Sequence, residues 1–299
     1  MNLCMNLCMK AVITLTVLLF LAPSIKAQQQ LVITSEPNAI VWIDDVRRGT
    51  TDAAGKLTLK VTPRRHTVRV RANGFKETSV PLVAGRRAIS VKLLPTTNEA
   101  ELTFQKAETA RESARDDAAR RTAADLYRDS IKLNPSYGPA HVGLARVLLD
   151  IGNFNDALDA VDAARQARPN YAEASAVEGR IHRENGNANE AIRSFRRSIR
   201  EAGGFQPEAH VGLARVLEDK GQFAEAVVEL RAAIDQLSDS EPVIYQMLGA
   251  AYEKLEKPKQ AVAAYEKYLQ LAPSGSYAAA IRSILDQLKR EAAGETIIP

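Results

Sequence analysis

The chain has 299 residues, 45% of them hydrophobic and 25% charged, with a formal net charge of +4. This length predicts about two domains of roughly 150 residues, with ample apolar side chains for a core. The only cysteines, Cys4 and Cys8, lie at the amino terminus, so the rest of the chain can form no disulfide, thiol nucleophile or thiolate metal site.

Residues 1–27 are interpreted as a secretory signal peptide. Lys10 precedes an apolar run from Ala11 to Ala22, which is shorter than the roughly 20 residues of a spanning helix, and Ala27 is a small residue suited to cleavage. Met9 is an alternative start, and an uncleaved membrane anchor is the alternative to a signal peptide. We therefore expect a protein secreted across the inner membrane, periplasmic or at the cell surface, and not integral to the membrane if the signal is cleaved.

The charges are unevenly distributed after this segment. Residues 28–97 carry twelve Lys/Arg and five Asp/Glu, whereas residues 98–299 carry 26 Lys/Arg and 31 Asp/Glu. A basic amino-terminal module therefore precedes a mildly acidic remainder.

Residues 28–97 alternate apolar and polar side chains in short runs separated by Gly, Pro, Asp and Asn, which predicts a small antiparallel β-sandwich. Arg69 and Arg71 alternate with valines, so we expect one solvated, basic face. Trp42 is expected to face the core. The predicted strands are Leu31–Ser35, Ala39–Ile43, Leu57–Val61, His66–Val70 and Ile89–Leu93.

This module resembles a PEGA domain, a family named after a motif close to S-x-P-x-G-A-x-V-x-x-D-G followed by G-T-T. The segment after Pro37 is one residue short, and Asn38 and Asp45 replace glycines, although both residue types tolerate left-handed backbone. The resemblance implies an envelope or surface location and no chemistry. The matching residues are Ser35, Pro37, Ala39, Val41, Asp44, Gly49, Thr50 and Thr51, with Gly74–Phe75 at a later turn.

After a linker at residues 95–98, alanines recur at intervals of 34 or 35 residues with the same companions. A small residue stands twelve positions before each alanine from the second onward, and a bulky one four positions after each of the five. The alanines are Ala123, Ala157, Ala191, Ala226 and Ala261, and three repeats end with Pro135, Pro169 and Pro273.

The last repeat resembles the tetratricopeptide repeat (TPR) through Leu248, Gly249, Tyr252, Ala261, Tyr265 and Pro273. The resemblance implies an all-α, right-handed superhelical solenoid, in which each unit buries its apolar face against its neighbours. The expected units are about 104–137, 138–171, 172–206, 207–241 and 242–275, within residues 98–275. A capping helix over 276–292 and a tail over 293–299 follow.

No catalytic, cofactor or metal site is predicted, and we do not expect an enzyme. The sequence lacks G-x-S-x-G, H-E-x-x-H, G-x-x-x-x-G-K-S/T and G-x-G-x-x-G motifs. His141 and His210 occupy equivalent places in two copied repeats, which explains them by duplication. Glu178 and His182 replace leucines of those repeats and can pair at four-residue spacing. They indicate a local structural pair, a slight register shift in the most divergent repeat, or a pH-sensitive weak point.

A row of arginines is the candidate partner-binding site, because the TPR resemblance places it on the concave face. Such a row suits an acidic segment. An acidic residue follows each arginine by one helical turn, so a solvated stripe of neutralised charge is the alternative. The arginine row is Arg146, Arg180 and Arg215, and the acidic residues are Asp150, Glu184 and Asp219.

The sequence therefore predicts a non-catalytic interaction scaffold of the bacterial cell envelope that binds a protein or peptide in its concave groove. The alternative is an attachment protein whose basic PEGA-like domain binds a glycan or anionic envelope polymer, with the repeats as a spacer. Few aromatic residues accompany the basic charge, and export is expected, so nucleic acid is not an expected partner.

Overall fold

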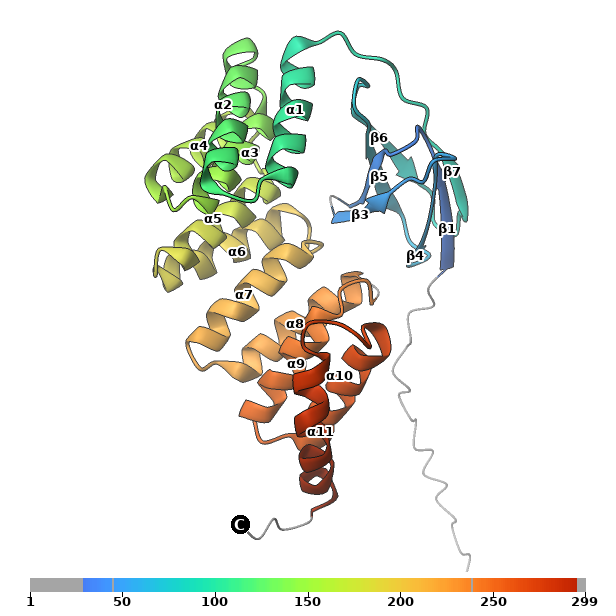
Figure 1. Ribbon diagram of the computed structural model, residues 1–299, viewed down its shortest axis with the longest axis vertical. Helices are drawn as coiled ribbons and strands as arrows, with labels where there is room; N and C mark the ends of the chain where they lie inside the picture. Colours follow the sequence, from blue (N-terminus) through green and yellow to red (C-terminus); the bar gives the residue numbers. More distant parts are fainter. Residues whose placement is uncertain (1–28, 45, 238, 295–299) are drawn as a thin grey trace, which may run out of the picture.

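The computed structural model describes residues 29–44, 46–237 and 239–294 as a β domain followed by a helical array (Figure 1). The predicted signal peptide and most of the predicted tail lie outside the described residues. None of the described helices is long and apolar enough to span a bilayer.

The β domain has two sheets, with strand orders β4-β1-β7 and β3-β2-β5-β6. All pairs are antiparallel except β1 with β7, which is parallel. The core between the sheets contains fully buried side chains such as Leu31, Ile33, Val68 and Val70. The strands are β1 (Gln29–Thr34), β2 (Ile40–Ile43), β3 (Val46–Thr50), β4 (Lys56–Val61), β5 (His66–Arg71), β6 (Thr78–Leu82) and β7 (Ala88–Ser90).

The turn between β1 and β2 shows how the motif residues act. Asn38 has a φ of 57°, as expected for a residue that replaces glycine, whereas Asp45 lies outside the described residues. The Thr51 hydroxyl accepts a hydrogen bond from the backbone of Ala39 at 2.8 Å and donates one to the carbonyl of Glu36 at 2.7 Å. The side chain that follows β3 therefore fixes the turn that precedes β2.

The helical array consists of five antiparallel helix pairs and a final helix. The first pair begins at Glu99, before the expected residue 104, because the Asn98 side chain caps this helix. The helices are α1 (Glu99–Ser113), α2 (Asp117–Leu133), α3 (Gly138–Asp150), α4 (Phe154–Ala167), α5 (Ala172–Glu184), α6 (Ala188–Glu201), α7 (Pro207–Asp219), α8 (Phe223–Leu237), α9 (Val243–Lys254), α10 (Pro258–Leu271) and α11 (Ala278–Ala293).

The recurring small and bulky residues pack the units together. All five recurring alanines are fully buried. A Cβ atom built on Gly179 would lie 2.6 Å from the Phe195 ring, and one on Gly212 would lie 2.4 Å from it. Phe195 on α6 therefore fills the space between α5 of its own unit and α7 of the next. Its ring fits there because Gly179 and Gly212 carry no side chain. The three prolines each follow a helix end by two residues.

Candidate functional site

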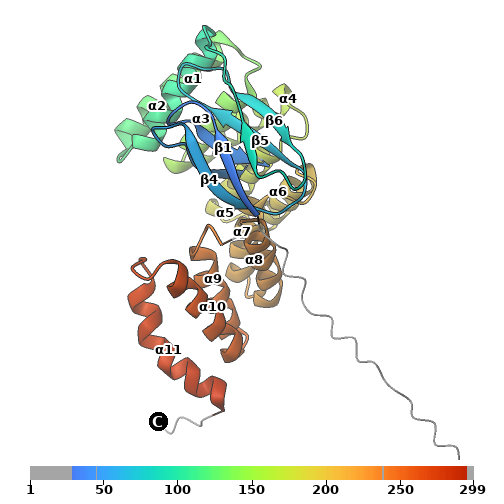
Figure 2. The same cartoon turned by 90° about the vertical axis from the view of Figure 1, so that its right-hand side faces the viewer.

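The candidate site is a cavity of about 610 Å³ between the β domain and the helices, here called the interdomain cavity. The first helices of successive units, α1, α3, α5 and α7, contact one another and form one wall. Strands β2 and β5 form the other through Trp42, Arg69 and Arg71. The strands lie in front of the upper helices in Figure 2, while α10 and α11 remain uncovered.

The outer face of the β3-β2-β5-β6 sheet is therefore only partly solvated, contrary to expectation: Thr67 is exposed, whereas Arg71 is buried. Trp42 faces this cavity and not the core, and its ring lies 4.4 Å from the guanidinium of Arg69 and 5.0 Å from that of Arg71. Arg71 is only 6% exposed. Alternation correctly placed the arginines opposite the valines, but the helical array covers the part of their face around Trp42 and Arg71.

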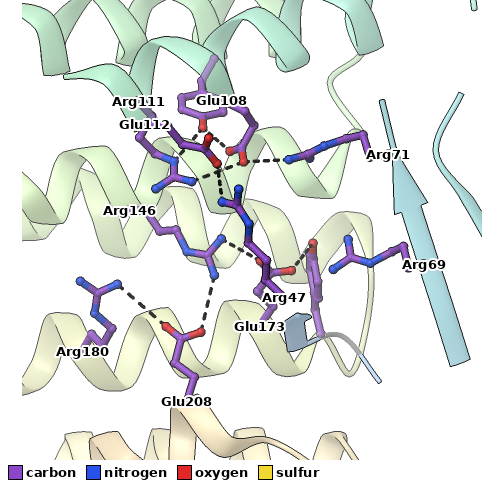
Figure 3. Close-up of polar contacts among 12 residues, drawn as sticks. Arg47, Arg69, Arg71, Glu108, Arg111, Glu112, Arg146, Glu173, Arg180 and Glu208 are labelled. Atoms are coloured by element: carbon purple, nitrogen blue, oxygen red, sulfur yellow. Dashed lines mark hydrogen bonds and ion pairs between the residues drawn. The ribbon is translucent and has the colours of Figure 1, made fainter. Parts of the chain in front are cut away.

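Ion pairs join this face to α1 (Figure 3). Arg71 lies 3.1 Å from Glu108, and Arg47 lies 2.7 Å from Glu112. Burial raises the pKa of Glu108, but Arg111 and Arg71, with a hydrogen bond from Tyr127, outweigh burial and lower this pKa to about 2. Glu108 is therefore ionised at neutral pH and attracts arginines of both domains.

Buried hydrogen bonds reinforce the contact with α1. Gln105, which is 4% exposed, accepts a hydrogen bond from the Gly74 amide at 2.8 Å and donates one to the Phe75 carbonyl at 2.9 Å. Glu101 accepts from the Glu77 amide at 2.9 Å. Because side chains of α1 satisfy backbone groups near β6, the β domain has a defined position on the first unit.

A second, smaller contact joins the β domain to the third and fourth helix pairs. The Arg64 guanidinium lies 4.5 Å from the centre of the Phe205 ring, in the loop between α6 and α7. Arg48 donates to the Leu237 carbonyl at 3.4 Å, and Val46 packs against the apolar core that the third, fourth and fifth pairs share. The β domain therefore bridges the array from its first unit to its fourth.

The arginine row lines the interdomain cavity, but its ion pairs are not those expected within each helix. Arg146 binds Glu173 of the next unit at 2.7 Å and lies 3.8 Å from Glu208 two units away. Burial lowers the pKa of Arg146, but these two carboxylates outweigh burial and raise it. Burial raises the pKa of Glu173, and Arg146 outweighs burial and lowers it. Both groups of this pair are therefore charged.

The rest of the row is more weakly paired. Arg180 lies 3.7 Å from Asp150 and 3.9 Å from Glu208, and its side chain is 40% exposed. Arg215 is exposed and forms no ion pair within 4.0 Å among the described residues, although it interacts electrostatically with Glu218. Glu184 and Asp219 both pair with Arg183 instead, at 3.0 and 3.2 Å. Arg180 and Arg215 are therefore the least closely paired arginines of the cavity, although Glu184, Glu208 and Glu241 also line it.

Glu178, His141 and His210 make contacts within the helical array. Glu178 pairs with Arg165 and Arg197 and not with His182. His141 contacts the carbonyl of Pro135 at 2.8 Å, and His210 that of Gly204 at 3.4 Å, in each case six residues upstream. Among the described residues, no group of three or more His, Cys, Asp or Glu could hold a metal ion.

Comparisons with known proteins identify the helical array. Three family models described as tetratricopeptide repeat match residues 114–181, 176–242 and 242–274. No curated protein sequence matches the chain significantly.

Solved structures share the fold. The crystal structure of TTC0263, a thermophilic TPR protein in Thermus thermophilus, is 19% identical, with a TM-score of 0.50, and the match covers 64% of this chain and 98% of that one. PilW, described as a widely conserved type IV pilus biogenesis factor, is 15% identical, with a TM-score of 0.56 and coverage of 67% and 89%. Residues 114–274 of this chain are therefore an array of tetratricopeptide repeats, a fold that generally serves as a protein-interaction scaffold.

Proposed function

We propose that this protein is a non-catalytic scaffold that binds an acidic segment of a partner protein at the α5–α7 end of the interdomain cavity. The observation that carries the proposal is the incomplete pairing of Arg180 and Arg215 in a cavity wall where the other arginines have close carboxylate partners. Arginine presents a planar fork that matches a carboxylate, so two such groups on successive units suit an acidic segment.

The proposed location is the bacterial cell envelope. The amino-terminal apolar run supports export, and the PEGA-like motif residues support a surface or periplasmic site. The alternative, attachment through the basic β domain to an anionic polymer, has less support. Five basic residues of this domain face or contact the helical array: Arg47, Arg48, Arg64, Arg69 and Arg71.

Affinity capture from envelope extract tests the proposal. The bait proteins are the unaltered chain, a variant with Arg180→Ala and Arg215→Ala, and a control with Arg196→Ala and Arg231→Ala. The control residues are exposed arginines on α6 and α8, outside the interdomain cavity. We expect a protein that the unaltered chain and the control retain and that the cavity variant loses by about tenfold, as measured by quantitative mass spectrometry. Equal capture by all three baits would exclude these arginines as the binding site.

A further inference from the structure

The β domain and the first repeat unit form one body. Phe104 and Gln105 on α1 are 3% and 4% exposed, and Arg71 of β5 lies over the Phe104 ring at 5.0 Å. Two backbone groups of the β domain depend on Gln105 for their hydrogen bonds, and separation of the domains would leave the buried amide unpaired. A partner that enters the cavity therefore contacts a β domain that already has a fixed position on the first unit.

The linker between the domains adds to this attachment. The Thr96 amide donates to the Gly74 carbonyl at 2.9 Å, and the Thr96 hydroxyl donates to Glu101 at 2.9 Å. These contacts hold the chain between the last strand and α1 against both domains, so the connection is not a free hinge.

The contact with the fourth unit is thinner. It rests on the long hydrogen bond of Arg48, on Val46 and on the Arg64 side chain, which is 50% exposed. The interdomain cavity lies between these two contacts, and its volume is within the range of about 300–1,000 Å³ that ligand sites occupy.

The two walls of the cavity differ in chemistry. On the helical side, the lining that contains Arg180 and Arg215 also contains the partly exposed apolar residues Val211 and Val243. On the β side, Arg69 and Arg71 are paired with Glu77 and Glu108, and the partly exposed ring of Trp42 lies against their guanidinium groups. A segment that alternates acidic and apolar side chains in extended form complements both walls, because successive side chains of an extended chain point to opposite sides.

We propose that the cavity is a two-walled site, in which an extended acidic segment of a partner protein lies between the tetratricopeptide helices and the outer face of β2 and β5. This inference rests on the proposed function and adds that Trp42 contacts the bound segment. The β domain then determines which segments fit, because it limits the space above the arginines.

The first test uses the fluorescence of Trp42, which is the only tryptophan of the chain. The probe is a synthetic decapeptide of alternating glutamate and valine, and a decapeptide of alternating lysine and valine is the control. We expect the acidic peptide to shift and saturate the Trp42 emission of the full chain, while the lysine peptide leaves it unchanged. Binding of the acidic peptide without any change in Trp42 emission would overturn the two-walled site.

The second test measures binding of the fluorescein-labelled acidic peptide by anisotropy. We expect Trp42→Ala to weaken binding about tenfold and Trp42→Phe to restore most of it, because a buried aromatic contact of this kind carries much of the affinity of an interface. The matched control is Val83→Ala, an exposed apolar residue of the β domain outside the cavity. Circular dichroism and urea unfolding establish that each variant is folded.

The outcomes separate the two proposals. If the Arg180 and Arg215 substitutions abolish binding while Trp42→Ala leaves it intact, the two-walled site is wrong and the proposed function stands. If the acidic peptide does not bind, or the lysine peptide binds equally well, both proposals are wrong. If both sets of substitutions weaken binding, the two-walled site is supported.

Discussion

At the scale of single residues, the arginine row shows that one repeated position has a different role in each unit. Arg146 is held by carboxylates of two later units, Arg180 lies at the outer limit of ion pairing, and Arg215 is exposed. Local spacing predicted pairs within one helix, as between Arg146 and Asp150. The superhelix instead brings first helices of successive units together, so the partners come from neighbouring repeats, which the sequence does not reveal.

His182 is expected to make the array less stable in mild acid. Burial lowers the pKa of His182, and Arg193 and Arg165 lower it further, while Glu190 raises it. The unfolded chain therefore binds the proton more readily, and stability falls as the pH decreases through the ordinary histidine pKa of about 6.5.

Replacement with leucine, the residue of the copied repeats, tests this effect. We expect His182→Leu to raise the free energy of unfolding by about 1 kcal/mol and to flatten its dependence on pH between 7 and 5. Urea unfolding at several pH values measures both. His141→Leu is the contrasting variant, because it removes a hydrogen bond to Pro135 and should destabilise the protein. An unchanged pH dependence in His182→Leu would show that this histidine is not a pH-sensitive weak point.

At the scale of elements, the helices were more predictable than the strands. The recurring alanines and prolines located the helix pairs, because each repeat has the same small and bulky contacts. Strands β3 and β6 were not predicted. Strand β3 has Arg47, Arg48 and Gly49 in sequence and little alternation, and β6 contains Pro81, a residue usually confined to edge strands. The sheet order shows that both are edge strands.

The contact of Phe195 with α7 yields a prediction for the junction of the third and fourth units. We expect Gly212→Val to destabilise the array by about 1–3 kcal/mol, because the added side chain would overlap the Phe195 ring. The control is Ala224→Val, at an exposed position of α8, which changes helix propensity without a packing conflict. Urea unfolding followed by circular dichroism measures both variants. Equal stability of the two variants would contradict the close packing of the Phe195 ring against Gly212.

At the scale of the whole molecule, the uneven charge has an intramolecular explanation. The basic β domain lies on the acidic array, and ion pairs such as Arg47–Glu112 and Arg71–Glu108 cross the boundary. The sequence revealed the asymmetry and the two domains, but not their docking, since net charge does not identify the surface that will neutralise it. The prediction that Trp42 faces the core was wrong because the array covers this side of the sheet, so an apolar side chain there can be partly buried outside the core.

Docking of the domains through Glu108 should depend on pH. The pKa of Glu108, about 2, lies below the ordinary value of about 4.3, so its contribution is complete above pH 4.3 and is lost as the pH falls through 2. We expect Glu108→Gln to lower the free energy of unfolding by about 2 kcal/mol at pH 7, with a smaller difference at pH 3.

A double-mutant cycle of Glu108→Gln and Arg71→Ala measures how far the effect depends on the contact between domains. We expect a coupling energy of about 1–3 kcal/mol, because the two side chains are only 8% and 13% exposed and share an ion pair. The cycle of Glu112→Gln and Arg47→Ala is the exposed counterpart, for which we expect less than about 1 kcal/mol. Additive effects in the buried cycle would mean that this pair does not hold the domains together.

The bridge from the first unit to the fourth has a mechanical consequence. A solenoid of repeats can lengthen and twist like a spring, because each unit contacts mainly its neighbours. Here a folded domain connects units one and four beside the coil, so stretching the first four units must break contacts at Phe205 or Leu237 first. Elastic compliance is therefore concentrated in α10 and α11, since the start of α9 still lines the cavity.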